Sequence, residues 1–111
     1  MVELRQTSRA SFETSVEFSV NGRTERIAGH ARDISLGGMF VVAKPEDVPA
    51  FGAKVVIHVT IPGEKAPFSL PGVVRWTRGD GMGVQFGLLG VRETRGILDV
   101  MRPDDSEEIK F

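Results

Sequence analysis

Two stretches of alternating apolar and polar residues constrain the fold of this chain more than any other feature. Between residues 14 and 20 every second side chain is apolar, which is the period of a strand with one buried face. Asn21-Gly22 follows directly, and because both residues tolerate a positive φ, it predicts a type I′ turn and a return strand over about residues 24–34. Residues 54–61 alternate in the same way. The chain is therefore predicted to be mainly β-structure.

Shorter apolar runs predict three further strands. They lie at residues 39–43, 68–77 and 82–86, and the last two flank a glycine-containing turn at 78–81. Short strands at this spacing are typical of a β-sandwich or a barrel.

A single segment has a helical pattern. At residues 91–101 five side chains fall close to one face of a helix, namely Val91, Thr94, Ile97, Leu98 and Met101. Gly96 costs this helix roughly 1 kcal/mol relative to alanine. Pro103 is expected to end it.

The length of the chain predicts a single domain. With 111 residues, 41% of them hydrophobic, the chain is long enough to close one core and too short for two. We expect a flexible, ligand-binding N-terminal arm at residues 1–12, a β-domain with its closing helix at 13–103, and a solvated acidic tail at 104–111.

Composition narrows the function classes. The chain has no cysteine, so neither a disulfide nor a thiolate metal site can form. Its formal net charge is −1 and its pI about 6.1, so it lacks the broad positive field with which proteins bind DNA or RNA. No apolar run is long enough to insert into a membrane, and the first residues do not resemble a signal peptide. We expect a cytoplasmic protein that binds no nucleic acid and no metal or other cofactor.

The segment RDISLGGMF, residues 32–40, combines groups that can bind a ligand. Asp33 and Ser35 are two residues apart, so in extended backbone both project from one face. Gly37 and Gly38 have no Cβ, so the chain can turn sharply and its N–H groups can approach a ligand. A carboxylate beside a hydroxyl suits the donors on the edge of guanine. Taken alone, the segment is better explained as a tight turn in which an Asp or Ser side chain bonds to its own backbone.

A second candidate lies near the N-terminus, in RQTSR. Arg5 and Arg9 are four residues apart, a spacing that places both guanidinium groups on one side of a helix or of a strand. Two such groups match two phosphates, or one phosphate and one guanine edge. Taken alone, this segment is typical of a solvated polar arm.

Together, in this order and on a β-rich background, the two motifs make the chain resemble the PilZ domain family. The resemblance covers nearly the whole chain, including the GVQF strand at residues 83–86 and the closing helix. It implies a small antiparallel β-barrel of about six or seven strands with a C-terminal α-helix. It also implies binding of the bacterial second messenger cyclic di-GMP.

On that model Arg5 and Arg9 bind phosphates and guanine edges, and Asp33 and Ser35 bind a guanine. Gly37 and Gly38 shape the turn and offer backbone contacts. Arg32 is a secondary candidate, because its planar cation can stack on a base. Leu4 stands where many members of the family have a basic residue, so the number of nucleotides bound stays open.

The histidines and the tryptophan are expected to have structural rather than catalytic or binding roles. His30 and His58 lie at polar strand positions and are expected at the surface. For Trp76 we expect packing against the barrel or the helix rather than base stacking. The sequence contains no pattern typical of a catalytic triad or of paired catalytic carboxylates, so we expect a protein that is not an enzyme.

The leading hypothesis is an adaptor whose arm changes conformation when cyclic di-GMP binds, and which then signals to a partner protein. The alternative is a PilZ-like interaction module that does not bind nucleotide. A small nucleic-acid-binding barrel fits the fold class but not the charge or the few aromatic residues. The sequence leaves the partner open, and it leaves the choice between monomer and dimer open.

Overall fold

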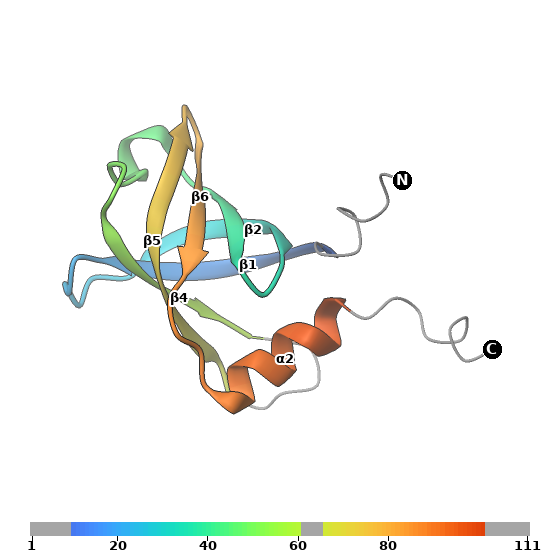
Figure 1. Cartoon of the computed structure of the whole chain (residues 1–111). Coiled ribbons are helices and arrows are strands. Elements are labelled where there is room, and N and C mark those ends of the chain that lie inside the picture. The colour runs from blue at the N-terminus through green and yellow to red at the C-terminus, as the bar shows by residue number, and fades with distance from the viewer. Residues whose placement is uncertain (1–9, 61–65, 102–111) are drawn as a thin grey trace, which may run out of the picture.

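The computed structural model describes residues 10–60 and 66–101, with side chains from residue 13 onward. Six antiparallel strands close into a barrel and a helix follows them (Figure 1). The elements are β1 (Ala10–Val20), β2 (Ile27–Ile34), β3 (Gly38–Val42), the short 3-10 helix η1 (Pro45–Asp47), β4 (Lys54–Val59), β5 (Phe68–Arg78), β6 (Gly81–Phe86) and α2 (Val91–Met101). The order around the barrel is β1-β2-β3-β6-β5-β4, and β4 pairs with β1 to close it. The expected barrel with a C-terminal helix is confirmed.

The turn after β1 has the predicted backbone conformation, but the return strand does not follow it directly. Asn21 and Gly22 have φ values of 50° and 79°, as a type I′ turn requires. The return strand, however, begins at Ile27 rather than near residue 24. The last two residues of β1, Ser19 and Val20, pair with β4 and not with β2. The predicted start of this strand was therefore wrong.

The reason lies in the contacts of Asn21. Its backbone N–H donates to the carbonyl of Lys54 at 2.7 Å. Its side-chain Oδ1 accepts from the N–H of Lys54 at 3.1 Å. The turn is thus bound to the first residue of β4, and this attachment directs the end of β1 toward the strand that closes the barrel.

The start of β1 also differs from the prediction. The strand begins at Ala10, four residues before residue 14, because Ala10 pairs with Ile34 and Ser11 with Asp33. Three residues assigned to the N-terminal arm therefore belong to the barrel. The acidic tail at 104–111 and the expected helix-ending residue Pro103 lie outside the described residues.

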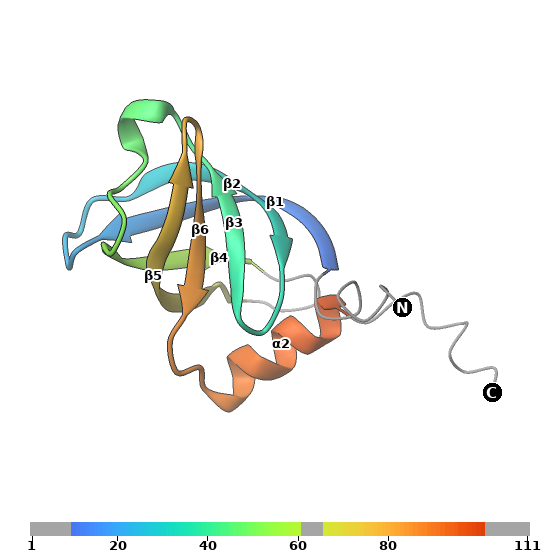
Figure 2. The same ribbon diagram turned by 45° about the horizontal axis from the view of Figure 1, so that its top comes forward.

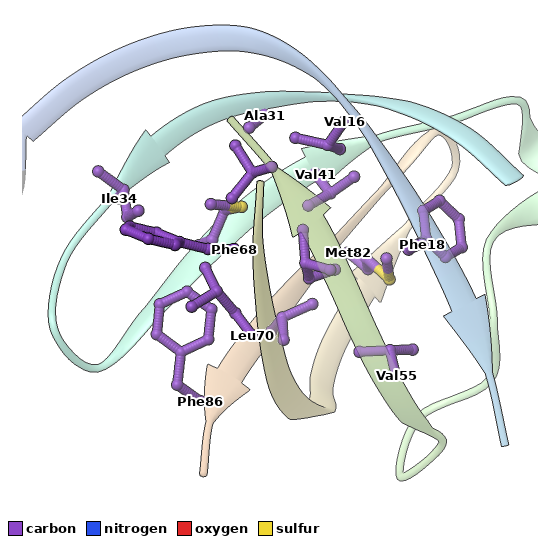
Figure 3. Packing of buried hydrophobic residues seen from close by; sticks show 14 of the residues in the cluster. Val16, Phe18, Ala31, Ile34, Val41, Val55, Phe68, Leu70, Met82 and Phe86 are labelled. Atoms are coloured by element: carbon purple, nitrogen blue, oxygen red, sulfur yellow. The ribbon is translucent and has the colours of Figure 1, made fainter. Parts of the chain in front are cut away.

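The barrel interior is filled by the apolar residues of the alternating strands (Figure 3). The largest fully buried side chains include Phe18, Phe68, Leu70 and Met82. Every second residue of β4 is buried, so its alternation predicted the inward face correctly. No buried polar or charged side chain occurs in the described part of the chain.

Helix α2 lies against one end of the barrel (Figure 2). Its bounds are those predicted, but its buried face is rotated from the predicted one. Gly96 and Ile97 are buried and Met101 packs against the core, whereas Val91 is 80% exposed and Leu98 is 45% exposed. In the described ranges no helix is long and apolar enough to span a membrane.

Candidate ligand-binding surface

The turn that joins β2 to β3, residues 35–38, is closed by its own hydrogen bonds. The Ser35 N–H donates to the Gly38 carbonyl at 2.9 Å, and the Gly38 N–H donates to the Ser35 carbonyl at 3.3 Å. The Gly37 N–H donates to the Ser35 hydroxyl oxygen at 3.2 Å. These three donors are therefore engaged within the turn before any ligand arrives.

The two glycines of this turn have different structural roles. Neither has a positive φ, so the turn does not depend on left-handed backbone. A Cβ on Gly38 would collide with the backbone carbonyl of Val84 on β6, whereas a Cβ on Gly37 would meet nothing closer than the Ser35 hydroxyl at 3.9 Å. Gly38 thus permits the close approach of β3 and β6, and Gly37 leaves space above the turn.

Four residues form a row across the outer surface of the barrel. Asp33 on β2 pairs with Phe40 on β3, Phe40 pairs with Gly83 on β6, and Gly83 pairs with Trp76 on β5. Asp33 is half-buried while its neighbour Ile34 is buried in the core, which places the carboxylate on the outer face. We call Asp33, Phe40, Gly83 and Trp76 the outer row.

Trp76 reaches over Gly83 and covers Phe40. The ring centroids of Trp76 and Phe40 are 5.2 Å apart and the planes are inclined by 15°. The Cζ of Arg78 lies 4.8 Å from the centroid of the Phe40 ring. Trp76 nevertheless remains 48% exposed. The expected packing of Trp76 against the barrel is therefore observed, on the outer surface. Part of its indole nevertheless remains accessible to a ligand.

An open hollow of about 160 Å³ lies between the turn and the outer row. It brings three of the predicted site residues, Ser35, Gly37 and Gly38, together with Arg75, Trp76 and Gln85. Arg75 Nε donates to Gln85 Oε1 at 2.6 Å. Sequence reasoning missed Arg75 and Gln85, because they are far from the motif in sequence. The pairing of β5 with β6 and of β6 with β3 brings them to the turn.

The remaining predicted residues lie beside the hollow or outside the described residues. Asp33 is next to Phe40 in the outer row. Arg32 is exposed, and its Nε lies 3.9 Å from a carboxylate oxygen of Glu13, an ion pair that contributes little because both groups are solvated. Arg5 and Arg9 lie outside the described residues.

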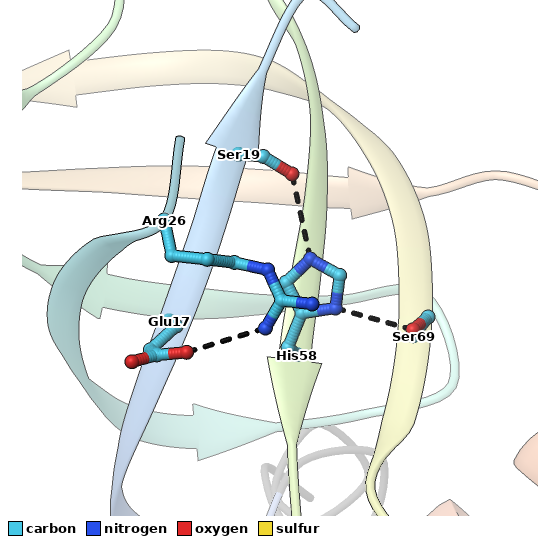
Figure 4. Close-up of polar contacts among 5 residues, drawn as sticks. All are labelled: Glu17, Ser19, Arg26, His58 and Ser69. Atoms are coloured by element: carbon cyan, nitrogen blue, oxygen red, sulfur yellow. Dashed lines mark hydrogen bonds and ion pairs between the residues drawn. The ribbon is translucent and has the colours of Figure 1, made fainter. Parts of the chain in front are cut away.

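Of the two histidines, only His30 is fully a surface residue. His30 is exposed, and its Nε2 lies 3.5 Å from a carboxylate oxygen of Glu13. His58 is half-buried on β4 between two hydroxyls, with Nε2 3.4 Å from Ser19 Oγ and Nδ1 3.1 Å from Ser69 Oγ (Figure 4).

The environment of His58 disfavours its protonated form. Burial lowers the pKa of His58 below its ordinary value of 6.5, the positive charge of Arg26 lowers it further, and Glu17 opposes this shift. Arg26 and Glu17 are themselves paired at 3.2 Å (Figure 4). Two strands separate β4 from β3 around the barrel, so this cluster is distinct from the hollow at Ser35.

Comparison with known proteins adds three solved structures of similar fold. The PilZ domain of CeSA from a cellulose-synthesizing bacterium matches with a TM-score of 0.67 and 16% identity, over 84% of this chain and 93% of that one. The Bacillus subtilis inhibitor of motility MotI/DgrA matches with a TM-score of 0.71 and 18% identity, over 93% of this chain and 51% of that one. PlzA from Borreliella burgdorferi, solved in complex with c-di-GMP, matches with a TM-score of 0.63 and 14% identity, over 91% of this chain and 44% of that one.

This chain therefore spans about half the length of MotI/DgrA and of PlzA. The comparison with curated proteins found no match. The model of the PilZ domain family matches residues 3–99, which include β1 to β6 and most of α2. The match covers most of the chain, and the fold agrees with it: the chain belongs to the PilZ domain family.

Proposed function

We propose that this chain is a receptor for cyclic di-GMP and not an enzyme. The observation that carries the proposal is the hollow in which the Ser35 turn meets the half-exposed indole of Trp76. Base stacking on an indole is favourable for any base. The Asp33 carboxylate accepts hydrogen bonds only from a base with donors on its edge, such as guanine. This surface therefore combines a stacking face with a guanine-selective acceptor.

The phosphates of the ligand are assigned to the arginines of the N-terminal arm. Arg9 is bonded to Ala10, and Ala10 pairs with Ile34, the residue between Asp33 and Ser35. Four residues of extended chain span roughly 13 Å, so Arg5 and Arg9 are both within reach of the hollow. On the described part of the surface, Arg75 and Arg78 add positive charge near the same rings.

We further propose that binding orders the arm that precedes β1, residues 1–9, over the hollow and creates a surface that a partner protein reads. Fixing the arm costs conformational entropy and lowers the apparent affinity. A partner that prefers the liganded form tightens ligand binding by the same factor. PlzA was solved with c-di-GMP, which supports this ligand for a barrel of this fold.

One observation favours the alternative, an interaction module that binds no nucleotide. The N–H groups of Ser35, Gly37 and Gly38 are all hydrogen-bonded within the turn, so the motif is complete as a structural turn. On this alternative, the arginines and Asp33 are surface residues without a shared ligand.

A calorimetric titration with cyclic di-GMP decides between the two. The receptor should show saturable heat and a stoichiometry, and GMP should bind far more weakly because it lacks the second phosphate and base. Trypsin should then cleave after Arg5 and Arg9 more slowly when cyclic di-GMP is present. Absence of binding would refute the receptor, and binding without protection would remove the proposed role of the arm.

A further inference from the structure

The outer surface of β4 and β5 carries an apolar patch that the proposed nucleotide site does not use. Val56 pairs with Pro71 across these strands, and Val73 follows on the same face of β5. A second hollow is lined by these three residues and by Leu88, which lies two residues after β6 and is 95% exposed. We call Val56, Pro71, Val73 and Leu88 the β4–β5 patch.

The backbone holds the parts of this patch in place. The Gly87 N–H donates to the Pro71 carbonyl at 2.9 Å, which anchors the chain just before Leu88. At the other side, the backbone and side chain of Asn21 are hydrogen-bonded to Lys54. The patch is thus a preformed surface, and a partner that binds it has little ordering cost to overcome.

The charged residues that line the hollow at the patch are both cations, although Arg23 also borders another hollow that is lined by Glu25, Glu46 and Asp47. Arg23 and Lys54 line the hollow at the patch, which has a volume of about 730 Å³. Among the described residues that line it there is no aspartate or glutamate. A docked segment that carried acidic side chains beside its apolar ones would meet complementary charge, whereas a basic segment would be repelled.

Two other modes of association fit this surface poorly. At the patch, Val56 pairs with Ser19 on one side and Pro71 on the other, and Val73 pairs with Lys54 and Gln85. The strands therefore offer no open edge there to an added strand. A second copy of the chain in a two-fold dimer would present the same patch. Arg23 and Lys54 of one copy would then face the same two cations of the other.

We infer that the β4–β5 patch docks an amphipathic segment of another protein, in which apolar side chains are flanked by aspartate or glutamate. The docking goes beyond the proposed nucleotide binding, because it uses other side chains and needs no nucleotide. The two surfaces are neighbours, since Val73 of the patch pairs with Gln85 of the Ser35 hollow.

The test is a selection of displayed short peptides that have a fixed amphipathic apolar face and randomised flanks, carried out without nucleotide. The unmodified protein should enrich peptides whose flanks are rich in Asp and Glu. The charge-reversed variant Arg23→Glu/Lys54→Glu should enrich Lys and Arg instead. A selected acidic peptide should shift the amide NMR signals of Val56, Val73 and Leu88, and should bind the charge-reversed variant at least about tenfold more weakly.

Matched controls separate the patch from general effects of charge and hydrophobicity. Leu88→Asp should abolish peptide binding, whereas Phe51→Asp changes an exposed apolar residue outside the patch and should leave it intact. Lys44→Glu repeats the charge change at an exposed lysine elsewhere. Flanks without a charge preference, peptide signals that shift only other residues, or association of the free protein with itself through Leu88 would each overturn the inference.

Discussion

Trp76 and Phe40 stack ring on ring although they come from strands that are not neighbours. Their centroids are 5.2 Å apart, and the strand between them, β6, contributes Gly83, which pairs with both residues. A Cβ on Gly83 would run into the indole of Trp76. Because Gly83 has no side chain, the indole of Trp76 can lie over β6, where it faces the proposed ligand.

Gly83→Ala should displace the indole and weaken cyclic di-GMP binding. The loss should approach that of Trp76→Ala, roughly 1–3 kcal/mol, the range for one base–aromatic stack. Trp76 is the single tryptophan of the chain, so its fluorescence emission reports the displacement directly. Gly79→Ala is the matched control, because a Cβ there meets nothing within 4 Å. An unchanged emission spectrum in Gly83→Ala would contradict this role of the glycine.

Arg9→Ala should weaken cyclic di-GMP binding by about 1.5–3 kcal/mol, the range for a hydrogen bond to a charged group. Arg9→Lys should restore binding only in part, because lysine lacks the forked geometry of a guanidinium. Calorimetric titration measures both variants. Arg95→Ala removes the same charge from an exposed position of α2 and should bind as the parent does. Equal affinities of the Arg9→Ala variant and the parent would show that Arg9 makes no contact with the ligand.

Asp33→Ala should reduce selectivity for guanine more than overall affinity. Adenine has an acceptor at N1 where guanine has a donor, so the parent should prefer cyclic di-GMP to cyclic di-AMP strongly, and the variant should prefer it less. The measurement is a pair of titrations for each protein. Glu46→Ala changes an exposed carboxylate far along the chain and serves as the control. A parent that binds both dinucleotides equally would rule out guanine reading by Asp33.

His58 should make the folded protein less stable in mild acid. Because burial and Arg26 lower its pKa below 6.5, the unfolded chain takes up this proton at a higher pH than the folded one. The stability associated with neutral His58 is fully present above pH 6.5 and is lost as the pH falls through the lowered pKa. Denaturant unfolding at a series of pH values should show this slope, and His58→Gln should flatten it.

Substitution of the two charged neighbours of His58 tests the direction in which each of them shifts its pKa. Arg26→Ala should raise the pKa of His58, because it removes a cation that lowers this value, and Glu17→Gln should lower it further. NMR titration of the His58 ring follows both changes. Shifts in the same direction for the two variants would show that the charges of this pair do not act on His58 as inferred.

Gly96→Ala should destabilise the protein although alanine favours a helix. A Cβ on Gly96 would collide with the ring of Phe68, and overpacking of this kind costs about 1–3 kcal/mol, more than the roughly 1 kcal/mol that alanine contributes to the helix. The free energy of unfolding in urea measures the difference. In a Phe68→Leu background, where the ring is gone, the same substitution should cost less. An equal cost in both backgrounds would locate the strain elsewhere.

The sequence by itself determined the local elements of this protein. The period-two alternation predicted the inward face of β4, Asn21-Gly22 predicted a turn with positive φ at both residues, and the bounds of α2 were correct. The two motifs also led to the family that the comparison found. These features depend on residues near one another in the chain, so their patterns can be recognised without knowledge of the fold.

Only the tertiary structure decided which of these elements meet. The attachment of Asn21 to Lys54, the outer row from Asp33 to Trp76, and the close approaches at Gly83 and Gly96 join residues far apart in the chain. Strand register and helix rotation are set by packing against distant partners, and no local period records them. For this reason the motif at residues 33–38 could be recognised in the sequence. The positions of Arg75, Trp76 and Gln85 beside it follow only from the strand order of the barrel.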